Sequence, residues 1–345
     1  MRAAVLRNYG GDLAIETVAD PDCPADGVVL RVLACGVCRS DYHGWVGEHA
    51  RVKPGQILGH EYCGEVIEAG PLAKWRLGDQ VLAPFILACG SCPSCQSGHS
   101  NTCPEQKLPG FTQAGAYAQR VAVPHAHNLV RLPASLTPAL AAGLGCRVTT
   151  AWHALTGRAA LQAGEWLAVH GTGGVGLAAM ILGRAIGARV VVVDVVREKL
   201  DYALALGADA AVDARTGRVA EAIIELTGGG AHVSVEALGI ALTTNTSIEC
   251  LRPLGRHVQV GMPTGHSARM EINMNAVYMR NLALFGTRGM PSWRYPSLLG
   301  LIETGRVDVR PLVAREIGLS GASAELRAFG GPTPPGVAVI TDFGG

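Results

Sequence analysis

Short apolar runs broken by glycine, proline and aspartate fill the chain up to about residue 145. Each run is four to seven residues long, and few longer helical patterns lie among them. Runs of this length that end at turn-forming residues are typical of β-strands. We therefore predict a mostly β, barrel-like domain here, with strands at Val28–Ala34, Gly64–Ala69, Gln80–Ala83 and Tyr117–Val123.

The pattern changes near Thr149, where 148–156 has helical character and alternating strands and helices follow. The predicted helices are Gly174–Ile186 and Glu198–Leu206. Such alternation predicts a parallel sheet covered by helices on both faces. After Gly286 the composition is mixed again, and the pattern alone does not assign the tail to either domain. The predicted strands are Trp166–His170, Arg189–Val193, Ala210–Val212, His232–Glu236, His257–Val260, Ala283–Gly286 and, in the tail, Val337–Ile340.

Composition and charge narrow the class of protein. A chain of 345 residues exceeds the ~250–300 residues over which one hydrophobic core usually grows, so two domains are expected. Hydrophobic residues make up 48% and charged residues 17%, which excludes a disordered chain. The formal net charge is only +1, so no overall charge favours a nucleic acid or an anionic membrane as partner.

One uncharged stretch, Trp166–Gly183, approaches the length of a membrane span. It contains five glycines, and a buried strand followed by a turn and a helix explains it better than a spanning helix. The first ten residues lack the apolar core of a secretory signal. We therefore expect a cytoplasmic protein without a membrane partner, whose ten cysteines stay reduced.

A glycine-rich loop stands between the strand predicted at 166–170 and the helix that follows it. Its G-x-G-x-x-G spacing permits a tight turn, close approach of a pyrophosphate and close helix–strand packing. The next strand leads to Asp194, an acidic residue suited to the ribose hydroxyls of NAD and repulsive to the 2′-phosphate of NADP. Arg197 and Lys199 follow closely and weaken this preference, since a basic group also accepts a phosphate. The loop residues are Gly171, Thr172, Gly173, Gly174, Val175 and Gly176.

Four cysteines lie within fifteen positions, in the spacing C-x2-C-x2-C-x7-C. Four thiolates can enclose one tetrahedral zinc ion and stabilise a loop that has little core of its own. An iron–sulfur cluster is the alternative, although the bacterial ferredoxin run has three residues before its last cysteine instead of seven. We favour a structural zinc site formed by Cys89, Cys92, Cys95 and Cys103.

Three further metal-ligand types are scattered along the chain at Cys38, His60 and Cys146. Two thiolates and one imidazole would give zinc three protein ligands and one open position, as in catalytic zinc sites. Taken singly, Cys146 is better explained as a small buried hydrophobe and His60 as a satisfied core histidine. Around the first cysteine, Asp41 is suited to orient a metal-bound imidazole. Ser40 and His43 are suited to pass a proton, or else they belong to an ordinary polar loop.

Several motifs occur together in one order: Gly36-Val37-Cys38-Arg39-Ser40-Asp41 with His43, then Gly59-His60-Glu61, the four-cysteine lobe, Gly143-Leu144-Gly145-Cys146 and the glycine-rich loop. In this the chain resembles, over nearly its whole length, the zinc-dependent alcohol dehydrogenases of the medium-chain dehydrogenase/reductase superfamily. The resemblance implies an α/β protein in which a GroES-like, mostly β catalytic domain accompanies a Rossmann, doubly wound parallel-sheet nucleotide domain. It also implies that the catalytic domain comprises residues 1–147 and 287–345 and that the nucleotide domain comprises 148–286.

The same resemblance assigns site residues. It implies a catalytic zinc held by Cys38, His60 and Cys146 with Glu61 beside them, and a proton relay from Ser40 to His43. It places Arg39, Asp194, Lys199 and Val260 with the glycine-rich loop as cofactor contacts, and Trp45 and Phe85 in a substrate pocket. The stretch Gly330–Gly336 departs from the family pattern, which leaves the local boundary and any cofactor contact there open.

The expected reaction is the reversible oxidation of an alcohol to an aldehyde or ketone, with hydride transfer to NAD. A polyol dehydrogenase or a carbonyl reductase of the same superfamily is the enzyme alternative, and an inactive zinc-binding regulatory paralogue is the alternative from another class. A polyol dehydrogenase commonly has glutamate where Cys146 stands. We expect two zinc ions per subunit, medium-sized primary or secondary alcohols as substrates, and a homotetramer, or otherwise a dimer.

Overall fold

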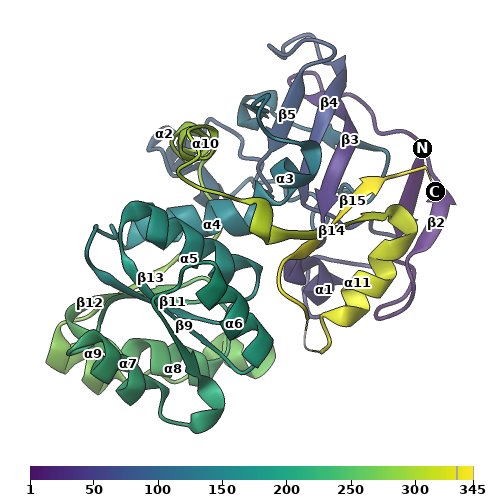
Figure 1. Ribbon diagram of the computed structural model, residues 1–345. Helices are drawn as coiled ribbons and strands as arrows, with labels where there is room; N and C mark the ends of the chain where they lie inside the picture. Colours follow the sequence, from purple (N-terminus) through teal and green to yellow (C-terminus); the bar gives the residue numbers. More distant parts are fainter. Residues whose placement is uncertain (332, 345) are drawn as a thin grey trace. The chain divides into compact units, whose positions relative to one another are not determined.

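Strand β3 (Val28–Gly36) lies at the centre of the first of two units in the computed structural model, which describes residues 1–331 and 333–344 (Figure 1). Seven of its nine positions are buried, because both faces of this apolar run are covered. It pairs antiparallel with β4 (Glu61–Ala69), β6 (Arg120–Val123) and β15 (Val337–Asp342). The main sheet has the order β14-β15-β3-β4-β5-β7, with β6 on β3. This unit is the mostly β domain that the short apolar runs predict.

The first unit contains residues 1–149, 289–303 and those from 309 onward. Its core gathers side chains from β1, β3, β4 and β15, among them Val5, Leu30, Tyr62 and Ile340. Its other strands are β1 (Arg2–Val5), β2 (Ala14–Thr17), β5 (Gln80–Ala83), β7 (Val130–Arg131) and β14 (Val313–Gly318). Its helices are α1 (Arg39–Trp45), α2 (Pro93–Gln96), α3 (Pro138–Ala142), α10 (Tyr295–Glu303) and α11 (Ala322–Ala328). Helix α4 (Thr149–Trp152) begins at the boundary, since Thr149 belongs to the first unit and Thr150 to the second.

The second unit is a six-stranded, fully parallel sheet in the order β10-β9-β8-β11-β12-β13. Counted from its first strand this is the order 3-2-1-4-5-6 of a Rossmann fold, which reverses between β8 and β11. Helices α5 and α6 cover one face, and α7, α8 and α9 cover the other (Figure 1). The strands are β8 (Trp166–His170), β9 (Arg189–Asp194), β10 (Ala210–Asp213), β11 (Ala231–Glu236), β12 (Leu251–Gln259) and β13 (Ala283–Gly286); the helices are α5 (Gly174–Ile186), α6 (Arg197–Ala205), α7 (Val219–Thr227), α8 (Ala241–Glu249) and α9 (Met274–Arg280).

Two sequence expectations differ from the structure in this region. The strand predicted at His257–Val260 begins six residues earlier, at Leu251, and ends at Gln259, so Val260 lies just beyond it. The sequence pattern does not predict the first half of this strand, because Pro253 and Gly255 both disfavour strands. The short segment Thr304–Asp308 groups with the second unit, whereas the family resemblance implies that it belongs to the first.

The glycine-containing stretch at 166–183 is a strand, a turn and a helix, as predicted. Among the residues that the structure describes, no helix is both long and apolar enough to cross a membrane.

Candidate metal and nucleotide sites

Cys38, His60 and Cys146 come together in the first unit, although 108 positions separate the first from the last. Cys38 caps the N-terminus of α1, His60 immediately precedes β4, and Cys146 lies in a helical segment at Leu144–Val148. One donor atom from each, with a carboxylate oxygen of Glu61, lies within 4.8 Å of the others. Gly145 permits this approach, since a Cβ there would lie 2.9 Å from the Cα of Glu61.

Asp41 orients the histidine of this cluster. Its Oδ1 accepts a hydrogen bond from His60 Nδ1 at 2.8 Å, which leaves Nε2 as the nitrogen directed toward the thiols. Three further donors hold the carboxylate, namely Cys38 N, Gly59 N and the Tyr117 hydroxyl. Asp41 is fully buried, so these four bonds replace its hydration. A carboxylate behind a histidine is the usual support of a metal-binding imidazole.

The electrostatics of the cluster suit a cation. A hydrogen bond from Cys146 and the neighbouring His60 lower the pKa of the Cys38 thiol well below its usual range. Burial raises the pKa of Glu61, and the Arg147 guanidinium opposes that rise. Neither oxygen of Glu61 has a hydrogen-bond partner among the described residues. Two sulfurs, one imidazole nitrogen and a buried carboxylate without hydrogen bonds fit a zinc ion.

Ser40 and His43 lie on α1 at different distances from the cluster. The Ser40 hydroxyl oxygen is 3.2 Å from Cys38 Sγ and 3.2 Å from His60 Nε2, so it borders the ligand atoms. His43 is turned toward Glu48, and its Nδ1 lies 2.6 Å from Glu48 Oε2. The described hydrogen bonds do not join Ser40 to His43 directly, so a relay between them needs an additional hydroxyl or water.

Two phenylalanines flank His60. The ring of Phe85 lies edge-on at 5.7 Å between centroids, and the ring of Phe111 lies at 5.2 Å. Trp45, the other expected pocket residue, is 5% exposed and donates its indole N–H to Gly11 O at 2.6 Å. Its recorded ring contact is with Tyr42, not with a metal ligand. The structure therefore brings Phe85, and also Phe111, to the cluster, and places Trp45 in the packed core of the unit.

The four-cysteine lobe forms a second cluster in the first unit. Between its sulfur atoms, Cys92–Cys95 measures 3.4 Å, Cys89–Cys103 3.5 Å, Cys92–Cys103 3.8 Å and Cys89–Cys95 4.0 Å. A tetrahedron with Zn–S bonds of ~2.3 Å has edges of about 3.8 Å, so these separations match one ion. Several iron atoms would hold the sulfurs farther apart. Backbone N–H groups of Ser91 and Cys92 also lower the pKa of Cys89 to about 6, which favours the thiolate.

Arg39 contacts Phe329, the residue directly before the segment where the sequence departs from the family pattern. Its guanidinium donates to Phe329 O at 3.1 Å and stacks over the rings of Phe329 and Tyr42. The departure at 330–336 includes Pro332, which lies outside the described residues. Arg39 therefore has a defined position on α1, fixed by the end of α11.

In the second unit, each glycine of the G-x-G-x-x-G loop has a distinct steric role. Gly171 has a φ of +89°, a conformation that glycine adopts without strain. A Cβ at Gly176 would lie 1.8 Å from Gly171 O, so the helix packs directly on the turn. A Cβ at Gly173 would meet nothing within 4 Å, and Gly174 and Val175 begin α5 behind it. This open backbone at a helix N-terminus is suited to a pyrophosphate.

Asp194 ends β9 beside this loop. Its Oδ2 accepts from Thr172 N and from the Thr172 hydroxyl, and its Oδ1 accepts from Val195 N and Val196 N. Lys199 lies in the first turn of α6 and donates its backbone N–H to Val196 O at 3.1 Å. Val260 donates its N–H to Glu236 O beyond the end of β12. The glycine-rich loop thus fixes the position of Asp194, which is expected to bind the same cofactor as the loop.

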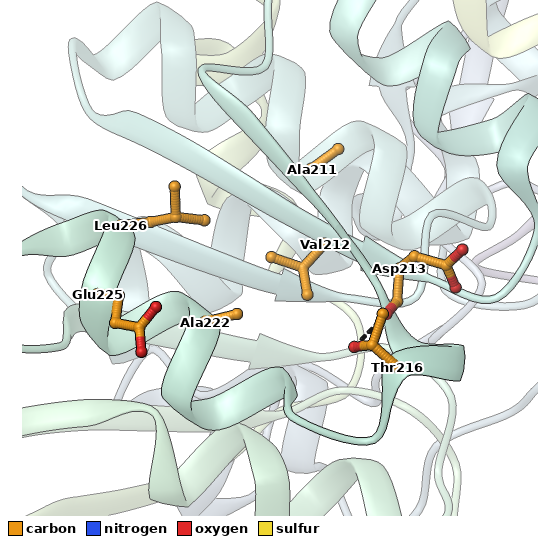
Figure 2. A pocket seen from close by; sticks show the side chains of 7 residues that line it. All are labelled: Ala211, Val212, Asp213, Thr216, Ala222, Glu225 and Leu226. Atoms are coloured by element: carbon orange, nitrogen blue, oxygen red, sulfur yellow. Dashed lines mark hydrogen bonds between the residues drawn. The ribbon is translucent and has the colours of Figure 1, made fainter.

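A surface pocket of about 500 Å³ lies between β10 and α7 of the second unit (Figure 2). Its two carboxylates, Asp213 and Glu225, each pair with an arginine, Arg215 and Arg218 respectively. No residue predicted for the metal or nucleotide sites lines it. The lining residues are Ala211, Val212, Asp213, Thr216, Ala222, Glu225 and Leu226.

The sequence patterns missed three residues near the metal cluster. Arg147 forms an ion pair with Glu61, and a charged residue within an apolar, glycine-rich stretch was a signal that pointed to it. Glu48 and Phe111 carry no local signal, because only the fold brings them to His43 and His60.

Two family models match the chain, an alcohol dehydrogenase GroES-like domain at residues 24–134 and a zinc-binding dehydrogenase at 174–304. An alcohol dehydrogenase of Geobacillus stearothermophilus is 35% identical over 267 residues, which are 76% of this chain and 78% of that protein. A sorbitol dehydrogenase of Halalkalibacterium halodurans is 28% identical and covers 93% of each chain.

Solved structures agree with these relatives. The alcohol dehydrogenase of Thermus sp. ATN1 superposes with a TM-score of 0.92 at 28% identity, over 99% of this chain and all of that one. A zinc-binding dehydrogenase of Sinorhizobium meliloti 1021, solved bound to NADP, has a TM-score of 0.87 at 28% identity, over 99% of this chain and 98% of that one. The predicted GroES-like and Rossmann folds are confirmed. The chain belongs to the zinc-dependent alcohol dehydrogenases of the medium-chain dehydrogenase/reductase superfamily and is an oxidoreductase that interconverts alcohols with aldehydes or ketones.

Proposed function

We propose that this enzyme oxidises alcohols reversibly with NAD, through a catalytic zinc ion held by Cys38, His60 and Cys146. The observation that carries the proposal is the convergence of one donor atom from each of these residues, with Glu61, within 4.8 Å. Three ligands of these types leave a zinc ion one open position, where an alcohol oxygen can bind. A second zinc ion, held by Cys89, Cys92, Cys95 and Cys103, has a structural role because four thiolates close its coordination.

Bound zinc supplies Lewis acidity, which shifts the pKa of a water ligand by roughly nine units or about 12 kcal/mol, while the nicotinamide ring accepts the hydride. A single positioned acid or base contributes only ~10²–10⁴-fold. The residues of this chain therefore act mainly by holding ligands and moving a proton. Asp41 fixes the tautomer and the orientation of His60.

Ser40 is the group placed to accept the alcohol proton, since its hydroxyl borders both Cys38 Sγ and His60 Nε2. His43 serves as the outer acceptor, and Glu48 stabilises the imidazolium that forms there. The described hydrogen bonds do not join Ser40 to His43, so this relay would need one further hydroxyl group or water molecule between them. Direct contacts join Cys38, His60, Ser40 and Asp41. An alcohol oxygen bound beside these residues would therefore lie close to its proton acceptor.

Aromatic rings beside the metal cluster support an apolar substrate site. Phe85 and Phe111 flank His60, and the ring of His49 lies 4.7 Å from that of Phe111. These rings favour the carbon chain of an alcohol over a polyhydroxylated one, because hydroxyl groups placed against them would lose their hydrogen bonds with water. We infer medium-sized primary or secondary alcohols as substrates, with Trp45 anchoring the end of α1 in the core.

NAD is the preferred cofactor in this proposal. Asp194 presents a fixed carboxylate at the end of β9, which repels a 2′-phosphate. The nearby Arg197 pairs with Asp201, and Arg215 pairs with Asp213, so both guanidinium groups already have carboxylate partners. Arg39, Lys199, Val260 and the loop at 171–176 complete the cofactor contacts that we propose.

A polyol dehydrogenase activity is the second candidate, favoured by the similarity to the sorbitol dehydrogenase. Cys146 at the third ligand position and the aromatic rings beside His60 favour simple alcohols instead.

We further propose a cytoplasmic homotetramer or dimer. The outer edge of β13 supports self-association, because among the described strands it pairs only with β12 and so offers a free edge to a second copy.

Metal analysis combined with a cofactor and alcohol screen tests this function. We expect two zinc ions per chain, NAD reduction with alcohols of one size class, and much weaker activity with NADP or sorbitol. Turnover that is unchanged after complete removal of the metal would contradict the proposal. Activity confined to sorbitol and related polyols would replace it with the second candidate.

A further inference from the structure

Arg147 places a charged group in the buried interior beside the metal cluster. Its side chain is 2% exposed and directly follows Cys146. One guanidinium nitrogen, Nη2, lies 3.1 Å from Glu61 Oε1 and donates to Val37 O at 3.0 Å. Val37 precedes Cys38, and Glu61 follows His60. Arg147 therefore connects the three chain segments that supply the proposed zinc ligands.

Glu61 lies close enough to that cluster to become a ligand itself. Its Oε1 is 4.0 Å from His60 Nε2, and one of its oxygens lies within 4.8 Å of the Cys38 and Cys146 sulfurs. The residue is fully buried, and no described group donates a hydrogen bond to either oxygen. A carboxylate oxygen binds zinc at ~2.0–2.2 Å, and a fourth protein ligand would close the site as in structural zinc centres.

Charge and packing oppose that closure. A guanidinium is always charged and offers the carboxylate a partner that needs no metal. Zinc with two thiolates is neutral overall, so the charge of Glu61 is balanced by Arg147. Gly36 and Gly145 also flank the carboxylate, since Cβ atoms there would lie 3.3 Å from Glu61 Oε2 and 2.9 Å from Glu61 Cα. Glu61 is therefore packed closely against the backbone at both glycines.

We propose that Arg147 is a positioning residue that holds Glu61 out of the zinc coordination shell and so keeps the fourth position open to substrate. This inference rests on the proposed zinc ligands Cys38, His60 and Cys146. Without the guanidinium, the nearest positive charge for the buried carboxylate is the metal ion. Glu61 then becomes the fourth ligand, the metal is bound more tightly, and external ligands lose access.

Cobalt substitution tests the inference through a spectrum instead of activity. Imidazole is titrated into the Co²⁺-substituted enzyme while the visible bands, which depend on coordination geometry, are followed. The four-cysteine site has no open position and should not respond. We expect a saturable shift in the native enzyme, and in Arg147→Met at least a tenfold weaker response together with slower removal of Co²⁺ by a chelator. The double variant Arg147→Met/Glu61→Gln should respond as the native enzyme does, because an amide is a weaker ligand.

Arg256→Met is the matched control, because it breaks an arginine–glutamate pair with Glu165 in the other unit and should leave the titration unchanged. A native imidazole response in Arg147→Met would overturn the inference. If that variant does not fold, the double variant carries the test, and loss of its response overturns the inference equally. If the native enzyme itself shows neither thiolate-to-cobalt bands from the Cys38 site nor an imidazole response, the proposed function fails instead.

Discussion

The Nδ1 atom of His60 lies 2.8 Å from Oδ1 of Asp41, and both side chains are almost completely buried. The carboxylate also accepts hydrogen bonds from two backbone N–H groups and from the Tyr117 hydroxyl. This network determines which imidazole nitrogen is directed toward Cys38 and Cys146. The orientation of the proposed zinc ligand is therefore fixed by hydrogen bonds from the protein itself.

Asp41→Asn is expected to weaken zinc binding at the Cys38 site by about 10–100-fold, the usual effect of losing the carboxylate behind a metal-binding histidine. The asparagine keeps the size of the side chain but removes the charge that stabilises the donating imidazole. Competition with a fluorescent zinc chelator measures the change. Asp26→Asn, which alters an exposed aspartate–histidine pair in the same unit, serves as the control. Equal zinc affinity in Asp41→Asn and the native enzyme would contradict this role.

Cys92→Ala is expected to remove one zinc ion per chain and to lower the melting temperature by on the order of 5–10 °C, because the lobe loses its central cross-link. The remaining folded enzyme should keep its kcat. Cys23→Ala is the control, since Cys23 lies outside both metal clusters. Calorimetry measures the melting temperature and metal analysis measures the zinc content. An unchanged melting temperature with one fewer zinc ion per chain would show that the lobe has no structural role.

His43→Gln is expected to lower kcat by up to about 10²-fold and to change its pH dependence, since the outer proton acceptor is lost. Glu48→Gln should give a smaller change in the same direction, because the carboxylate 2.6 Å from Nδ1 only stabilises the charged ring. Pre-steady-state measurements of hydride transfer from pH 6 to 9 separate this effect from product release. An unaltered pH profile in His43→Gln would exclude His43 from the relay.

Asp194→Asn is expected to reduce discrimination against NADP at least tenfold in kcat/KM, which corresponds to about 1.4 kcal/mol. The substitution removes the negative charge near the ribose and retains an acceptor for the Thr172 hydroxyl. Glu198→Gln, an exposed carboxylate in the first turn of α6, provides the control. If the NAD to NADP ratio stays the same in Asp194→Asn, cofactor choice depends on other residues.

The second unit should lose stability in mild acid because of two buried histidines. Burial lowers the pKa of His257 to about 4 and that of His170 to about 3, so both rings are neutral in the folded chain. The unfolded chain binds these protons near pH 6.5, which favours unfolding as the pH falls below that value toward the folded-state pKa values. His257 alone should cost roughly 2 kcal/mol of unfolding free energy between pH 7 and 5.

Urea denaturation at a series of pH values measures that slope. His257→Gln should flatten it, whereas His266→Gln, at an exposed position, should leave it unchanged. A slope in His257→Gln equal to that of the native chain would show that this ring does not carry the acid sensitivity.

Much of the second unit could be predicted from sequence because its signals are local. Strand β8 and helix α5 have the predicted bounds, since a buried apolar run, a glycine turn and a helical repeat follow one another directly. The first half of β12 could not be predicted, because Pro253 and Gly255 interrupt its pattern, and its regular pairing with β11 and β13 begins only at Arg256.

The two metal clusters also differ in how far the sequence predicts them. The four cysteines at 89–103 have a spacing that itself predicts one ion, and their sulfurs do converge. Cys38, His60 and Cys146 have no informative spacing, and their grouping became an expectation only through the family resemblance. The pairing of Arg147 with Glu61 depends on contacts across the unit, which no pattern along the chain contains.

Diffraction data collected on either side of the zinc absorption edge would test the catalytic site most directly. We predict two anomalous peaks per chain, one of them bonded to Cys38 Sγ, His60 Nε2 and Cys146 Sγ with a fourth ligand that exchanges for an added alcohol analogue. The absence of an anomalous peak bonded to these three atoms would contradict the account. A permanent bond between Glu61 and the metal in the native enzyme would contradict it as well.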